Sequence, residues 1–152
     1  MKNMTMSFLQ QLHAIEEYHF NIVIGSAYPY FDTIQEFDAK QNINIYRSLS
    51  ANEMSHILLD SDLAIVPASG VLFECIALGV PFITGYYIEN QREIASYFYS
   101  QDHRISLGEF SKATITKNTL SIAFEYPHQV IESIDGKSKD RLLDEFERLL
   151  TI

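Results

Sequence analysis

The sequence contains little of several residue types that define particular protein classes. It has one cysteine, four prolines, six glycines and no tryptophan among 152 residues. The single cysteine, Cys75, excludes an internal disulfide and is what we expect in a reducing cytoplasm. In the middle of a predicted helix, it is expected to be a buried apolar residue. The low proline and glycine counts exclude collagen-like and low-complexity chains, so the length predicts one globular domain over 1–152.

Basic clusters and long apolar runs are also absent. Lys and Arg number 11 against 20 Asp and Glu, which gives a net charge of −9. This balance argues against a nucleic-acid partner and against a polybasic membrane contact. No apolar run approaches the roughly 18 residues that span a bilayer, and the first residues have no signal-peptide core, so no transmembrane segment is expected. No histidine pair has metal-ligand spacing, and we predict neither a metal site nor a cofactor; the histidines are His13, His19, His56, His103 and His128.

Helical and strand patterns alternate along the chain. Strand patterns cover 20–24, 43–46, 62–66, 81–85 and 104–107. Helical patterns cover 4–18, 28–39, 50–60, 70–78, 89–99, 116–126, 129–134 and 139–150. Ser50 followed by Glu53 predicts a capping box at the third of these helices. This order predicts an α/β fold, a Rossmann-like parallel sheet with helices on both faces.

The segment from Asp62 to Gln91 is the most informative part of the chain. It reads DLAIVPASGVLFECIALGVPFITGYYIENQ, a strand–loop–helix–strand–loop–helix unit whose loops follow the carboxyl ends of strands, where open parallel sheets bind ligands. The first loop, Ala68-Ser69-Gly70, leaves backbone N–H groups at a helix start available to an anion. A carboxylate, Glu74, follows one turn later. On these residues alone, an ordinary capped turn and an exposed helical glutamate remain open alternatives.

The segment from Asn42 to Gln91 resembles the carboxyl-terminal half of GT-B nucleotide-sugar enzymes. The family pattern is a strand, then Ala/Gly-Ser/Gly-Ser-x-Leu-x-Glu, a helix, Leu-Gly-Val-Pro, a strand and Asn-Gln. The resemblance is closest to PseG-type UDP-sugar hydrolases and their SpsG-like relatives, and more distant to MurG-type glycosyltransferases. It extends weakly to Asp135-Gly136-Lys137, near the end of the chain.

The resemblance implies the UDP-binding half of a UDP-sugar hydrolase in surface-glycan (pseudaminic-acid-like) biosynthesis. One alternative is a domain or subunit of a UDP-sugar glycosyltransferase, and another is a non-catalytic remnant that mediates protein contacts. The ligand would be UDP or a UDP-amino sugar. The family's catalytic histidine belongs to its amino-terminal domain, so no catalytic residue is assigned here. We expect no turnover by the isolated chain.

The resemblance also implies residue roles in a UDP site. Glu74 would accept hydrogen bonds from the ribose hydroxyls, because an ionised carboxylate accepts from two donors at once. Many relatives have Gly-Gly-Ser-Thr where this chain has Ala68-Ser69-Gly70-Val71, so one hydroxyl remains near the phosphates. The diphosphate would face the backbone N–H groups of Ser69, Gly70, Val71 and Leu72, with Asn90 and Gln91 near the sugar and Leu49 near the uracil.

The family's carboxyl-terminal half opens with a strand and a Gly-Gly-x-Asp turn, followed by Asn-hydrophobic-Thr. This chain reads Lys2-Asn3-Met4-Thr5 at its start. The resemblance therefore implies that the family's amino-terminal domain and first, central strand are missing. We expect strands 20–24 and 62–66 either to pair directly or to leave a gap filled by another chain. We therefore expect the chain to associate with the missing amino-terminal domain or with a partner subunit. Self-association through exposed apolar surface is a further expectation.

Overall fold

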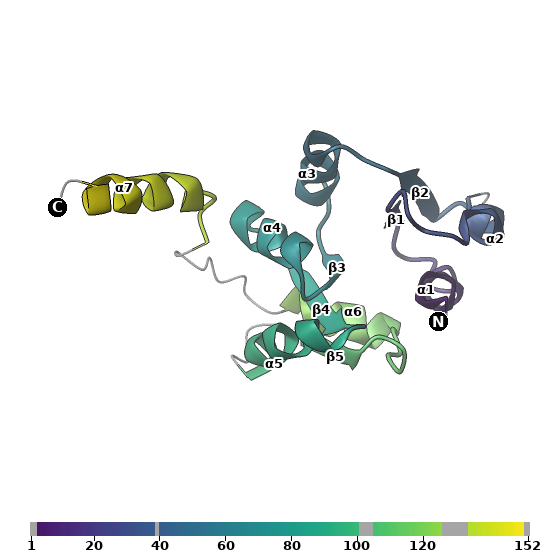
Figure 1. Ribbon diagram of the computed structural model, residues 1–152. Helices are drawn as coiled ribbons and strands as arrows, with labels where there is room; N and C mark the ends of the chain where they lie inside the picture. Colours follow the sequence, from purple (N-terminus) through teal and green to yellow (C-terminus); the bar gives the residue numbers. More distant parts are fainter. Residues whose placement is uncertain (1–2, 39, 101–104, 126–133, 151–152) are drawn as a thin grey trace.

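The computed structural model describes residues 3–38, 40–100, 105–125 and 134–150, and its strands form two parallel sheets (Figure 1). In the first sheet, β1 (Phe20–Ile24) pairs with β2 (Ile43–Arg47). In the second, β4 (Phe82–Tyr86) lies between β3 (Ala64–Pro67) and β5 (Ile105–Glu109). The strands alternate with helices along the chain, so the predicted α/β class is confirmed.

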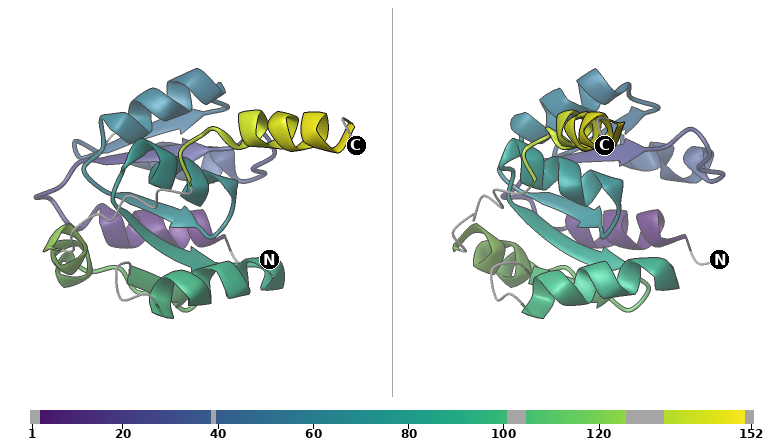
Figure 2. Two further views of the ribbon diagram at one scale, coloured as in Figure 1. Left: turned by 90° about the vertical axis from the view of Figure 1, so that its left-hand side faces the viewer. Right: turned by 60° about the vertical axis from the view of Figure 1, so that its left-hand side comes forward.

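Helices cover both faces of these sheets (Figure 2). The α-helices are α1 (Met4–Leu12), α2 (Phe31–Ile34), α3 (Ala51–Leu59), α4 (Gly70–Leu78), α5 (Arg92–Ser100), α6 (Lys117–Glu125) and α7 (Ser138–Leu150), with 3-10 helices η1 (Gln35–Phe37) and η2 (Glu89–Gln91). On one face α3, α4 and α5 enclose an apolar cluster with β3 and β4. On the other face α1 and α6 pack against strands of both sheets. None of the described helices combines the length and apolarity needed to cross a bilayer.

The termini of two central helices follow from their sequences. Ser50 caps α3 as predicted: its Oγ accepts from Glu53 N–H at 3.3 Å, and the Glu53 carboxylate accepts from Ser50 N–H at 2.8 Å. At the end of α4, Gly79 adopts the left-handed conformation with φ of 70°, which L-residues with a side chain rarely adopt. This turn ends α4, and the chain passes through Pro81 into β4.

Several predicted boundaries are wrong. The helix predicted over 4–18 ends at Leu12, because the side chain of Asn42 donates to Ile15 O at 3.2 Å and the chain turns there. The helix predicted over 28–39 is reduced to α2 and η1, whose buried side chains are Ile34 and Phe37. The helix predicted over 89–99 begins as the 3-10 turn η2. Strand β3 begins two residues later than predicted, and the helix predicted over 129–134 falls largely outside the described residues.

The strands on either side of the expected missing strand do not pair with each other. In the described part of the chain β1 has β2 as its only neighbour, and β3 has only β4. Of the two outcomes expected for strands 20–24 and 62–66, direct pairing is therefore wrong for the described strands. Both strands nevertheless contribute to one apolar cluster, through Phe20 and Ile22 of β1 and Ile65 of β3.

Candidate functional site

The start of α4 lies directly after the carboxyl end of β3 and is the centre of the candidate site. Ser69 is its N-cap residue, in an extended conformation, and its hydroxyl makes no capping hydrogen bond. Ser69 N–H donates to Pro67 O at 2.8 Å and Leu72 N–H donates to Ser69 O at 3.0 Å. Two of the four backbone donors predicted to face a diphosphate are thus already used within the turn.

The other two donors are available. Gly70 and Val71 are the first two residues of α4, where no intrahelical acceptor exists for an N–H group. No acceptor for either lies among the described residues. A Cβ placed on Gly70 would meet nothing within 4 Å. Space beside the helix start, two free N–H groups and an unbonded hydroxyl together are what an anion requires.

The side chains of α4 divide between the core and the solvent. Leu72 and Cys75 have no exposed surface and pack in the cluster on this face of the sheet. Burial raises the pKa of the Cys75 thiol to about 12, with a smaller contribution from the charge of Glu74. Cys75 is buried, as predicted. Glu74 is exposed and has no hydrogen-bond or ion-pair partner among the described residues, so its carboxylate is free to accept from a ligand.

Asn90 and Gln91 follow the carboxyl end of β4, at the same sheet edge as the start of α4. Gln91 is buried, and its Oε1 accepts from Tyr87 N–H at 3.2 Å. This bond fixes the loop between β4 and α5, a structural role that the sequence prediction did not include. Asn90 is exposed in η2. Leu49 is half-buried beside Ser48, which takes a φ of 54° after β2.

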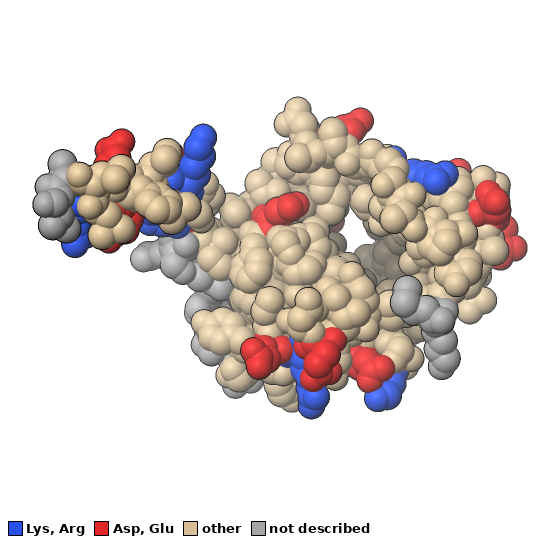
Figure 3. Space-filling view, viewed as in Figure 1, with Lys and Arg blue, Asp and Glu red and all other residues tan. Residues whose placement is uncertain are grey.

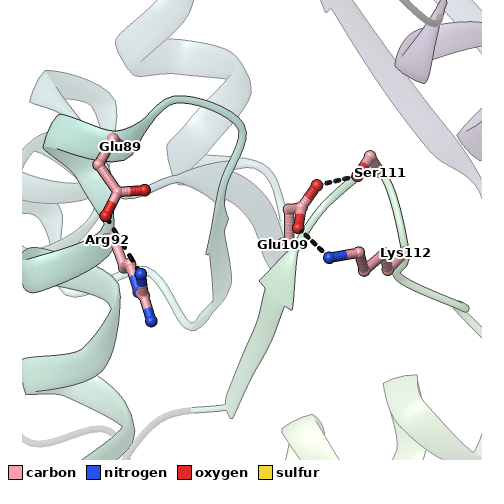
Figure 4. Close-up of polar contacts among 5 residues, drawn as sticks. All are labelled: Glu89, Arg92, Glu109, Ser111 and Lys112. Atoms are coloured by element: carbon pink, nitrogen blue, oxygen red, sulfur yellow. Dashed lines mark hydrogen bonds and ion pairs between the residues drawn. The ribbon is translucent and has the colours of Figure 1, made fainter.

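A polar pocket of about 420 Å³ lies at the carboxyl ends of β4 and β5. Two ion pairs line it, Arg92 with Glu89 at 3.2 Å and Lys112 with Glu109, which also accepts from Ser111 (Figure 4). Each cation is matched by a carboxylate. The hydrogen bond from Lys112, then that from Ser111, lowers the pKa of Glu109. Because its charges cancel, the pocket is better suited to a neutral polar group than to a phosphate. Tyr86, Tyr87 and Ile88 complete its lining.

A β-bulge in β5 orients one wall of this pocket. Thr84 pairs with Ser106 but Tyr86 pairs with Glu109, so β5 holds one additional residue there, and Gly108 takes a φ of 65°. Nothing in the sequence alone predicted this irregularity. The predicted strand ended at Leu107.

No group of three or more potential metal ligands occurs within residues 3–38, 40–100, 105–125 and 134–150.

Comparison with known proteins gives the fold but no family. No protein-family profile matches the chain. It is similar to the uncharacterized protein MJ1062 of Methanocaldococcus jannaschii, with 28% identity over 96 residues, which are 60% of this chain and 19% of that protein.

The structure is similar to the crystal structure of the glycotransferase of kitacinnamycin, with a TM-score of 0.63 and 16% identity. The match covers 97% of this chain and 39% of that one. The chain therefore has the fold of part of a glycosyltransferase. It spans well under half the length of both proteins.

Proposed function

We propose that this chain is the nucleotide-binding domain of an enzyme that transfers a glycosyl group from a UDP-sugar. The observation that carries the proposal is the start of α4. There the N–H groups of Gly70 and Val71, the hydroxyl of Ser69 and the carboxylate of Glu74 are all without partners in the described chain. This set offers donors for a diphosphate and an acceptor for a ribose, one helical turn apart.

The acceptor of the glycosyl group would be set by the rest of the enzyme. Transfer to water would make it a hydrolase of surface-glycan synthesis, as the sequence resemblance implies. Transfer to an alcohol would make it a glycosyltransferase, as the structural neighbour is. The pocket lined by the two ion pairs is the proposed place of the sugar, because hydroxyls can bind both members of an ion pair. No residue of this chain is proposed as acid, base or nucleophile.

Calorimetric titration with UDP tests the proposal. We expect binding by the wild-type chain and about ten- to a hundredfold weaker binding by Glu74→Gln, since a charge-assisted hydrogen bond contributes on the order of 1.5–3 kcal/mol. The matched control is Glu93→Gln, which removes an exposed carboxylate from α5 and should bind UDP as the wild type does. Uridine should bind more weakly than UDP, because it lacks the diphosphate.

Amide chemical shifts locate the site. Saturation with UDP should shift the amide resonances of Gly70 and Val71 most strongly. Absence of binding at millimolar UDP, or equal affinity in Glu74→Gln and wild type, would contradict the proposal and favour the role in protein contacts alone.

A further inference from the structure

The hydrogen bonds of β1 and β3 show which backbone groups lie on their unpaired edges. In a parallel pair, alternate residues direct their N–H and C=O groups to the same neighbour. Phe20 N–H donates to Asn42 O and Ala64 N–H donates to Pro81 O, both at 2.8 Å. The residues in between therefore direct their N–H and C=O groups away from β2 and β4. These residues are Asn21 and Val23 in β1 and Ile65 in β3.

The two unpaired edges face each other. Figure 1 shows β1 and β3 on the adjacent sides of the two sheets, with β2 beyond β1 and β4 beyond β3. Phe20 and Ile22 from β1 and Ile65 from β3 pack in one apolar cluster with Leu12 of α1, which joins the two sheets on that face. The space-filling view shows an opening through the molecule between the part with β1 and β2 and the part with α3 and α4 (Figure 3). We call the space between these two edges the strand slot.

The burial of the strands agrees with an unfilled slot. Four of the five residues of β4, which has neighbours on both sides, are buried. In β1 only Ile24 is buried, and β3 alternates between buried and half-buried residues. An interior strand of a parallel sheet is normally covered on both faces and apolar throughout. The slot thus lacks one strand with apolar side chains.

Helix α7 gives an independent indication that part of the structure's surface is meant to be covered. Every residue of α7 is exposed, and the helix projects away from the rest of the chain (Figures 1 and 2). Its apolar side chains form one stripe at helical spacing: Leu142, Leu143, Phe146, Leu149 and Leu150, all at least 50% exposed. A helix with such a stripe can lay its apolar face into a hydrophobic groove of another polypeptide.

A second copy of this chain is poorly suited to the slot. Each described strand of a copy is already paired. Two copies would also bring together two net charges of −9, which repel each other. A segment with basic residues beside its apolar strand would instead be attracted.

We propose that the strand slot binds a single extended segment of a partner polypeptide, about five residues long, apolar on both faces and flanked by basic residues. It would hydrogen-bond to Asn21 and Val23 on one side and to Ile65 on the other, joining the two sheets into one. This proposal does not depend on UDP binding, so either proposal can be contradicted while the other stands.

Amide hydrogen exchange with the peptide KKVIVIVKK as probe tests the proposal. In the free chain, the amides of Asn21, Val23 and Ile65 should exchange fast, and those of Phe20 and Ile22 slowly. Saturating peptide should slow the first three at least tenfold. The control peptide KKVIPIVKK has the same charge but a proline in the strand, and it should slow none of them.

The variant Asn21→Pro removes one N–H group from the slot edge, where a proline is tolerated because that group bonds to no strand. It should keep its circular dichroism spectrum and lose peptide binding. Slow exchange at the slot in the free chain would overturn the proposal, as would equal slowing by both peptides. Slowing that depends on protein concentration without peptide would show that a second copy fills the slot.

Discussion

The β3–β4–β5 sheet and the β1–β2 sheet come from the same chain and differ in how completely they are covered. Strand β4 is buried over four of its five residues, between two neighbouring strands. Strand β1 has one neighbour and one buried residue. The same contrast separates α4, with three fully or nearly fully buried side chains, from α7, with none. The β3–β4–β5 sheet carries the candidate UDP site. The strand slot lies between β1 and the unpaired edge of β3, and the apolar stripe is on α7.

The comparison teaches that a polar ligand site and a polypeptide surface need different surroundings. The site at α4 depends on a rigid helix start, fixed by Leu72 and Cys75 in the core. The uncovered elements instead expose unpaired backbone and apolar side chains, which are the groups that another chain can satisfy. The following predictions test this division, beginning with the largest expected effect.

Thiol reactivity should separate the two regions most strongly. Burial raises the pKa of Cys75 from 9.0 to about 12, so the thiolate fraction at pH 8 falls about a thousandfold, because each pKa unit is a factor of ten. Labelling of the variant Leu143→Cys with a maleimide should modify the α7 thiol within minutes and Cys75 only after unfolding. Mass spectrometry locates the label.

The raised pKa of Cys75 also predicts a pH dependence of stability. The folded state holds the proton more tightly than the unfolded state. The associated stabilisation is therefore complete below about pH 9, the unfolded pKa, and is lost as the pH rises towards 12.

Equal labelling rates for the two thiols at pH 8 would show that α4 is not packed as described.

Truncation of leucines should give the next largest difference. Leu72→Ala removes a side chain with no exposed surface and should lower the free energy of unfolding by about 2–5 kcal/mol. Leu143→Ala, at 50% exposed on α7, should change it by less than about 0.5 kcal/mol. Urea denaturation of the isolated chain measures both. A cost for Leu143→Ala as large as that for Leu72→Ala would show that α7 packs against its own chain in solution.

Glycine substitutions compare the two sheets directly. A Cβ on Gly85 in β4 would lie 2.2 Å from the ring of Phe110 and 2.7 Å from Gly108 O, so Gly85→Ala should cost about 1–3 kcal/mol by overpacking. A Cβ on Gly25, after β1, would meet nothing within 4 Å, so Gly25→Ala should be close to neutral. Thermal unfolding of both variants checks the difference, and a neutral Gly85→Ala would contradict the close packing of β4 against β5.

The capping box of α3, which connects the two sheets, should give the smallest effect. Ser50→Ala should cost about 1 kcal/mol. The matched control Ser55→Ala removes a hydroxyl that bonds Asn52 O within the same helix and should cost less. Hydrogen bonds from Ser50 lower the pKa of Glu53, so their stabilisation is present above the unfolded pKa and is lost as the pH falls. The cost of Ser50→Ala, measured by urea denaturation, should shrink accordingly in acid.

The sequence predicted the elements with strong local signals and missed those that depend on tertiary contacts. The cap at Ser50, the end of α4 at Leu78 and the burial of Cys75 are encoded within a few residues of each position. The early end of α1 depends on Asn42, 27 residues away from the Ile15 carbonyl that it binds. The role of Gln91 depends on a loop backbone group, and the polar pocket depends on β5 reaching Glu109. Neither the role of Gln91 nor the polar pocket produces a periodic pattern in the sequence.

The additional residue at Gly108 decides which side chains face which layer at the end of β5. Leu107 packs on the α1 side of the sheet, and Phe110 meets Phe8 of α1 on that same side, at 5.3 Å between ring centroids. Strict alternation would have placed Glu109 there instead, and Phe110 on the pocket side. Deleting one residue near Gly108 would therefore exchange a carboxylate and a phenyl ring between core and pocket. At this position the length of the chain, more than the identity of any residue, separates a polar pocket from a buried charge.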